Sequence, residues 1–137
     1  MDTPRAALTQ AVLEGVAFAI RDCVEIAKAH GVEITASTLC GGGAKSPLWR
    51  KILANVLGIP LTLPQTEQGP GYGGAMLAAV ACGAYPDVRS CAEALVRAKQ
   101  TTEPDAALVA KYNARYAVWR KLYPALKASF AEMEALV

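Results

Sequence analysis

The stretch CGGGAKSPLW, from Cys40 to Trp49, decides the fold of this chain because it predicts where a strand ends and a helix begins. Three consecutive glycines follow an apolar segment, and glycine readily adopts the positive φ angles that tight turns require. Ser46 and Pro47 come next; serine is favoured at a helix N-cap and proline at the first helical position. The stretch therefore predicts a strand, a glycine turn and a helix in immediate succession.

The neighbouring segments fit this order. Residues 33–40, EITASTLC, predict a short strand, and residues 59–64, IPLTLP, predict a second one. Between them, apolar residues recur at helical spacing until Gly58, where the helix should stop. Before them, residues 5–30 carry the apolar period of a long helix that ends at Gly31.

The second half of the chain predicts mostly helices. The expected elements are a small-sided helix over Gly73–Cys82 after a polar loop at residues 65–72, a short helix over Ser90–Lys99, a linker over Thr101–Pro104, a helix over Asp105–Tyr123, and a continuation over residues 125–136 after a break at Pro124. Alternating helices and strands indicate an α/β fold. Two strands alone make a poor sheet, so we expect the helix-rich end of a larger α/β unit, with a small incomplete sheet.

Composition excludes several classes of protein. The chain has 137 residues, 53% of them hydrophobic and 19% charged, which indicates a folded domain. A net charge of +2 with scattered basic residues argues against a nucleic-acid partner. Residues 1–10 show no apolar segment behind a basic start, as a signal peptide would, and no membrane-length segment is free of charges, so we expect a cytoplasmic protein without a membrane partner. The four cysteines show no metal-ligand spacing and are expected to be small buried residues.

The glycine turn is the candidate binding site. In open α/β sheets, ligands bind at the carboxyl ends of strands, and a helix that begins there offers free N–H groups. Gly41–Gly43 would suit a nucleotide lying on bare backbone, with Ser46 capping the helix or contacting the ligand. The spacing is neither GxGxxG nor that of a P-loop. A purely structural turn with a serine cap explains the same residues equally well, so the residues alone leave both readings open.

Three segments resemble the C-terminal part of the FGGY carbohydrate kinases. They are Glu14–Asp22 (EGVAFAIRD), Gly41–Leu61 (GGGAKSPLWRKILANVLGIPL) and Gly69–Asp87 (GPGYGGAMLAAVACGAYPD). Within that family the likeness is greatest to the xylulokinases. The resemblance implies that residues 1–137 form a C-terminal segment of the second kinase domain, on its adenosine-binding side. That domain has an actin-like, ribonuclease-H-like ATPase fold, and the first domain lies outside this chain.

The resemblance also implies a chemistry. Family members transfer the γ-phosphoryl group of ATP, bound with Mg²⁺, to a sugar hydroxyl; xylulokinases convert D-xylulose to D-xylulose 5-phosphate. The family's adenosine loop is similar to Gly41, Gly42 and Gly43, its polar adenosine contact falls on Ser46, and its next nucleotide-side segment includes Gly73. ATP or ADP is then the expected ligand, and the sugar is bound mostly by the missing domain. No catalytic residue and no metal ligand is assigned to this chain.

Alternatives and further expectations follow from what the chain lacks. Another FGGY kinase, acting on ribulose, glycerol or a different ketose or polyol, would share these motifs. A stand-alone nucleotide-binding or interaction module is a reading from another class. The family's catalytic aspartate belongs to the first domain, so the 137-residue chain alone is expected to be inactive. The aromatic stripe from Leu108 to Tyr123 and the incomplete sheet would leave apolar surface exposed, which predicts self-association.

Overall fold

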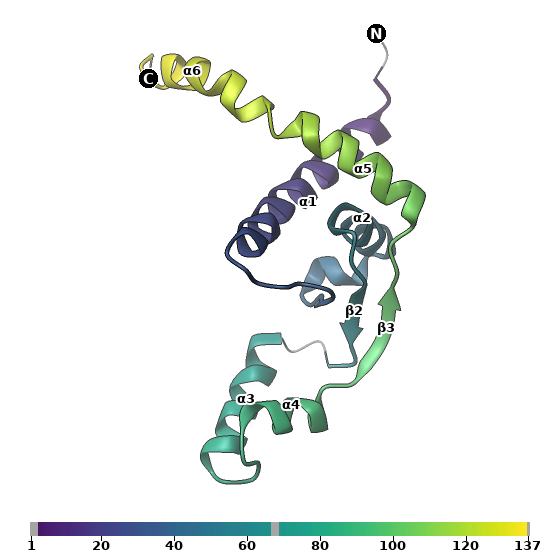
Figure 1. Ribbon diagram of the computed structural model, residues 1–137, viewed down its shortest axis with the longest axis vertical. Coiled ribbons are helices and arrows are strands. Elements are labelled where there is room, and N and C mark those ends of the chain that lie inside the picture. Colours follow the sequence, from purple (N-terminus) through teal and green to yellow (C-terminus); the bar gives the residue numbers. More distant parts are fainter. Residues whose placement is uncertain (1–2, 67–68, 137) are drawn as a thin grey trace. The chain divides into compact units, whose positions relative to one another are not determined.

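The computed structural model describes residues 3–66 and 69–136, which divide into two compact units (Figure 1). Unit 1 contains residues 3–33, 55–58 and 104–136. Unit 2 contains residues 34–54 and the described part of 59–103. The glycine turn belongs to unit 2.

The sheet of unit 2 has the strand order β1–β2–β3. β1 (Ser37–Thr38) pairs parallel with β2 (Leu61–Pro64), and β2 pairs antiparallel with β3 (Ala98–Thr102). The first two strands lie within the segments where strands were predicted, although both are shorter than expected. Parallel pairing of β1 with β2 places the carboxyl ends of these strands at the same edge of the sheet.

β3 is the strand that the sequence analysis missed. The helix expected over Ser90–Lys99 ends earlier, as α4 (Val88–Leu95), and the expected linker overlaps the end of the strand. β3 reads AKQTT, and a strand without alternating apolar residues gives no hydrophobic signal. Its place comes from pairing with β2, where Leu61 lies opposite Thr102. The fold is thus helix-rich, with a small mixed sheet of three strands among the described residues instead of two.

The connection from β1 to β2 contains a 3₁₀ helix, η1 (Gly42–Lys45), followed by α2 (Pro47–Leu57). α2 begins directly after Ser46 and ends before Gly58, whose φ is 68°. Both ends of this helix are therefore confirmed. The 3₁₀ helix was not predicted, because three glycines carry no helical signal of their own.

The small-sided helix α3 (Gly69–Ala81) begins earlier than the predicted start at Gly73. The polar loop expected before it includes residues 67 and 68, which lie outside the described residues. α3 packs against α4, and the hydroxyl of Tyr72 donates a hydrogen bond to the Leu95 carbonyl oxygen at 3.0 Å. This pair of helices completes unit 2.

Unit 1 is built around aromatic contacts between α1 (Arg5–Ala29) and α5 (Ala106–Trp119). The ring centroid of Phe18 on α1 lies 6.1 Å from that of Tyr112 and 5.8 Å from that of Tyr116. All three side chains are buried. The middle of the predicted aromatic stripe is therefore core.

The end of the stripe is different. α6 (Leu122–Glu134) begins after a break at residues 120–121, and Pro124 sits in its first turn, where a missing amide hydrogen is tolerated. Tyr123 is 64% exposed. The expectation that the stripe would leave a broad apolar surface therefore fails for Tyr112 and Tyr116 and holds for Tyr123.

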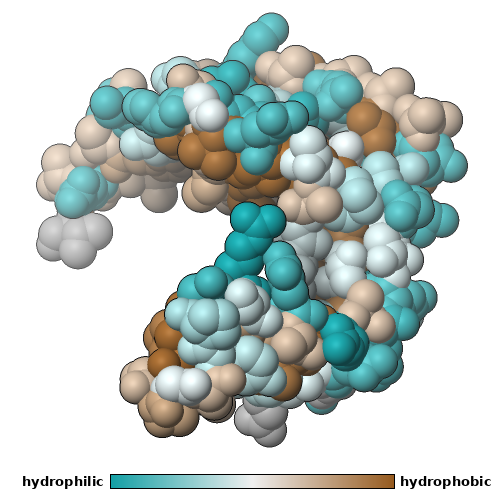
Figure 2. All heavy atoms as spheres, turned by 60° about the horizontal axis from the view of Figure 1, so that its bottom comes forward, coloured by the Kyte–Doolittle hydropathy of each residue, from teal (hydrophilic) through white to brown (hydrophobic). Residues whose placement is uncertain are grey.

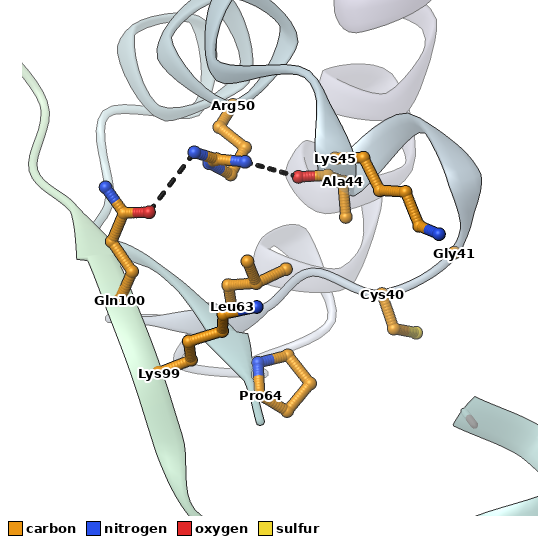
Figure 3. Close-up of a pocket in the computed structure, with 9 residues that line it drawn as sticks. All are labelled: Cys40, Gly41, Ala44, Lys45, Arg50, Leu63, Pro64, Lys99 and Gln100. Carbon is orange, nitrogen blue, oxygen red and sulfur yellow. Dashed lines mark hydrogen bonds between the residues drawn. The ribbon is translucent and has the colours of Figure 1, made fainter. Parts of the chain in front are cut away.

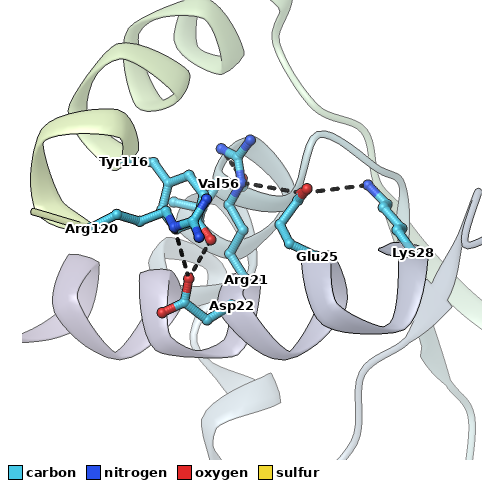
Figure 4. A network of polar contacts seen from close by, with 7 residues as sticks. All are labelled: Arg21, Asp22, Glu25, Lys28, Val56, Tyr116 and Arg120. Atoms are coloured by element: carbon cyan, nitrogen blue, oxygen red, sulfur yellow. Dashed lines mark hydrogen bonds and ion pairs between the residues drawn. The ribbon is translucent and has the colours of Figure 1, made fainter. Parts of the chain in front are cut away.

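Polar contacts join α1 to α5 beside the aromatic core (Figure 4). The hydroxyl of Tyr116 donates a hydrogen bond to the Asp22 carboxylate. The guanidinium carbon of Arg21 lies 4.3 Å from the centroid of the Tyr116 ring, and its Nη1 donates to the Val56 carbonyl oxygen at 3.0 Å. Asp22 also faces Arg120, whose Nε is 3.9 Å from Oδ1. Tyr116 is thus held from both its ring face and its hydroxyl.

This arrangement predicts an alkaline loss of stability. Burial, followed by the hydrogen bond to Asp22, raises the pKa of Tyr116 to about 12. An unfolded tyrosine titrates near 10. The unfolded chain therefore releases its proton first, and the free energy of unfolding should fall as pH rises from about 10 towards 12. Burial also raises the pKa of Tyr112, which adds to the same decline.

Urea unfolding between pH 8 and pH 11 tests this. The free energy of unfolding of Tyr116→Phe should decline less steeply with pH than that of the parent. Tyr123→Phe is the control, because Tyr123 is exposed, and it should follow the parent. An equal decline in all three proteins would contradict the assignment.

The outer surface keeps hydrophobic side chains among polar ones (Figure 2). In unit 1 the exposed large apolar residues of α6 are Leu122, Tyr123, Leu126, Phe130 and Met133. The expectation that the cysteines are buried is wrong for Cys23, Cys40 and Cys82 and confirmed for Cys91. Across residues 3–66 and 69–136, no helix combines the length and apolar character needed to cross a membrane.

Candidate functional site

The predicted glycine turn begins at Gly41, three residues after the end of β1 at Thr38. Gly41 has φ 89° and ψ 178° and precedes η1. Within the turn, the amide of Ala44 donates to the Gly41 carbonyl oxygen at 3.1 Å, and that of Ser46 donates to the Gly43 carbonyl oxygen at 3.1 Å. The turn is therefore a hydrogen-bonded structure of its own between the strand and α2.

The three glycines are present for different reasons. Gly41 needs its positive φ, which other residues rarely adopt. A Cβ on Gly43 would lie 3.2 Å from the indole of Trp49, so close packing favours glycine there. Gly42 has neither constraint: its φ is not in the positive range, and a Cβ would meet no atom of residues 3–66 and 69–136 within 4 Å. The positive φ that a tight glycine turn requires therefore belongs to Gly41 and not to Gly42.

Ser46 performs the predicted capping role. Its Oγ accepts a hydrogen bond from the amide of Trp49 at 3.3 Å, at the first turn of α2. A hydroxyl has one donor and two acceptor sites, so this bond leaves capacity for a second partner. The proposed ligand contact of Ser46 remains a prediction.

A pocket of about 270 Å³ opens beside the turn (Figure 3). Its lining residues are Cys40, Gly41, Ala44, Lys45, Arg50, Leu63, Pro64, Lys99 and Gln100. Of the five predicted site residues, all of which the structure describes, only Gly41 lines it. Gly42, Gly43 and Ser46 belong to the same turn, whereas Gly73 lies on α3.

The pocket is cationic. Lys45, Arg50 and Lys99 line it, and none of the described residues that line it is acidic. Clefts lined by one sign of charge raise the local concentration of ligands with the opposite charge. A phosphate-bearing ligand beside the turn would therefore be favoured.

The sequence analysis missed Arg50, Lys99 and Gln100. Arg50 is followed directly by Lys51, which is exposed, so the sequence alone does not tell which of these two cations is buried. Lys99 and Gln100 belong to β3, which had no signal, so their place beside the turn could not be expected.

Gly73 is connected to the turn less directly. The first residue of its helix, Gly69, lies beside Cys40, because a Cβ built there would be 3.5 Å from the Cys40 sulfur. Gly73 itself has open space around its Cα. Its predicted role towards the nucleotide stays a prediction. No three His, Cys, Asp or Glu side chains within residues 3–66 and 69–136 lie together as a metal site would need.

Comparison with known proteins gives consistent relatives. Residues 1–82 match the model of the FGGY family of carbohydrate kinases, C-terminal domain. A xylulose kinase of Staphylococcus epidermidis is 30% identical over 129 residues, which cover 94% of this chain and 26% of that protein. A ribulokinase of Mycolicibacterium smegmatis is 36% identical over 124 residues, covering 90% of this chain and 22% of that protein.

A solved structure agrees with these relatives. A xyloylose kinase from Brucella ovis superposes with a TM-score of 0.83 at 41% identity, covering 93% of this chain and 26% of that chain. This chain spans about a quarter of the length of the xylulose kinase relative. With a family model matching more than half of the residues, the chain belongs to the FGGY family of carbohydrate kinases.

Proposed function

We propose that this chain is the adenosine-binding part of an ATP-dependent sugar kinase that converts D-xylulose to D-xylulose 5-phosphate. The observation that carries the proposal is that Gly42 lacks a side chain where the fold would accept one. Gly42 begins η1, where a Cβ would meet no atom of the described residues within 4 Å and φ is not positive, so the fold itself does not require glycine there. A ligand that lies against bare backbone explains the missing side chain.

The fit of ATP rests on the turn and the pocket beside it. Gly41, Gly42 and Gly43 would carry the adenosine on exposed backbone, Ser46 would offer its second hydrogen-bonding site, and Gly73 would lie on the same nucleotide side. The cations of the pocket suit a phosphate-bearing ligand. We assign no residue of this chain to the Mg²⁺ ion that accompanies ATP.

The remaining parts of the kinase are proposed to lie outside residues 1–137. The xylulose kinase of Staphylococcus epidermidis is about four times as long as this chain, since the match covers 26% of it. The catalytic base and most of the sugar site would belong to the first domain. Phosphoryl transfer needs the two substrates positioned together in one site, so the 137-residue chain alone should show no transfer.

The similarity to the M. smegmatis ribulokinase gives a specific reason to test a second ketose. The full-length kinase, meaning the protein that carries this chain together with a first domain, should be assayed with D-xylulose, ribulose and glycerol. D-Xylulose should give the highest kcat/KM. Faster turnover of ribulose would assign a ribulokinase instead, and no ATP-dependent phosphorylation of any sugar would reject the kinase.

Self-association of the 137-residue chain is also proposed. The surface for it is the exposed apolar row of α6, which includes Leu122, Leu126 and Phe130. Light scattering over a concentration series should show a mass above that of one chain, and Leu126→Lys should lower it. A constant monomer mass would contradict this.

A further inference from the structure

We propose that Arg50 is a positioning residue that holds the glycine turn in the shape that receives the nucleotide. The inference rests on the proposed function, because it deepens the role of the same turn. Arg50 has no contact with the nucleotide in this proposal; it acts through the backbone of the turn and through β3.

The first observation is the burial of Arg50. The side chain is only 7% exposed, and charged residues are rarely buried unless they are paired. Arg50 forms no ion pair with any residue in 3–66 or 69–136. It donates hydrogen bonds to two uncharged oxygen atoms instead. Nη1 donates to the Ala44 carbonyl oxygen at 2.6 Å, and Nη2 donates to Oε1 of Gln100 at 3.2 Å (Figure 3).

The second observation explains why the Ala44 carbonyl needs this donor. Ala44 lies in η1, where each carbonyl would ordinarily accept from the amide three residues later. That residue is Pro47, which has no amide hydrogen. Ala44 is 2% exposed, so water cannot readily take the place of the amide. The guanidinium of Arg50 supplies the donor that Pro47 lacks.

The third observation is that Arg50 joins three elements. It belongs to α2, it binds the 3₁₀ turn at Ala44, and it binds β3 at Gln100. A planar guanidinium can serve two acceptors in fixed directions, whereas a lysine ammonium at the end of a flexible chain cannot reproduce both. The Ala44 carbonyl, directly after Gly42 and Gly43, is thereby linked through Arg50 to the sheet.

The test compares Arg50→Met with Arg21→Met in the full-length kinase. Arg21 is a matched control because its Nη1 also donates to a backbone carbonyl oxygen, that of Val56 at 3.0 Å, but in unit 1. Arg50→Met should raise the KM for ATP about tenfold and leave the KM for the sugar within about twofold. Amide deuterium exchange over residues 41–46 should become faster. Arg21→Met should lower Tm and leave both KM values and that exchange unchanged.

Further variants keep the test decisive if Arg50→Met does not fold. Gln100→Leu removes the anchor on β3 and should raise the KM for ATP by a smaller factor, and Arg50→Lys should fall between the parent and Arg50→Met. The inference is overturned if folded Arg50→Met or Gln100→Leu keeps the parent KM for ATP, or if Arg21→Met raises it equally. A parent kinase without ATP-dependent activity would instead overturn the proposed function, and the inference with it.

Discussion

Gly42→Val in the full-length kinase is expected to weaken ATP binding more than about tenfold, a loss above 1.4 kcal/mol, and to leave sugar binding nearly unchanged. The valine side chain would occupy the open space above the turn, where a Cβ meets nothing within 4 Å in this structure. Because φ at this position is not positive, the substitution adds no backbone strain of that kind. The folded turn should therefore persist, and the lost space should be felt by the ligand.

Gly41→Ala is the matched control. Gly41 has φ 89°, a conformation that L-residues rarely adopt, so this variant should lower Tm. Ser46→Ala gives a second comparison: a lost hydrogen bond is worth about 0.5–1.5 kcal/mol, so ATP affinity should fall by roughly three- to tenfold. Loss of the hydrogen bond from the Trp49 amide to the Ser46 hydroxyl, which caps α2, would also lower helix stability by about 1 kcal/mol.

Calorimetry with ATP, calorimetry with the sugar and thermal melting on the same variants separate the two readings of the turn. If Gly42→Val folds normally and binds ATP as tightly as the parent, the turn is not the nucleotide site. If it loses both ligands together with thermal stability, the glycine serves the fold alone.

Leu53→Ala is expected to cost the 137-residue chain about 2–5 kcal/mol of unfolding free energy, the usual range for a large-to-small change in a core. Leu53 is 2% exposed and lies on α2 in unit 2, between the buried residues Ile52 and Ala54. Removing part of this buried side chain leaves a cavity that the surrounding core can fill only in part. Such a cost is a large share of the total stability of a small domain.

Leu48→Ala on the same helix is the control, because Leu48 is 60% exposed. Exposed substitutions away from special features usually change stability by no more than about 0.5 kcal/mol. Urea unfolding of both variants should therefore show a large and a small decrease. Equal decreases would mean that the buried residues of α2 do not contribute to a core.

Local chemistry made part of this structure predictable from the sequence. Ser46, Pro47 and Gly58 mark the ends of α2 through capping and backbone preferences that need no tertiary information. Gly31, with φ 83°, ends α1 for the same reason. The apolar faces of these helices were also readable from their spacing.

Long-range contacts made the rest unpredictable. The position of β3 depends on pairing with β2. The burial of Arg50 depends on contacts with Ala44 and with Gln100, which lies 50 residues later in the sequence. The pocket is lined by residues of the turn, α2, β2 and β3, which are far apart in the sequence. Its lining could therefore not be deduced from the glycine motif. The positive φ of Gly41 could be expected, because glycine adopts such angles without steric cost.

The polar composition of β3 has one more consequence. Within the described residues β3 is an outer strand of the sheet, and outer strands with unpaired backbone groups can recruit strands from other molecules. Four of its five residues, including Lys99, are exposed, and a charge on such an edge discourages further pairing. The property that hides this strand from a hydrophobicity pattern therefore also protects the sheet against edge-to-edge aggregation.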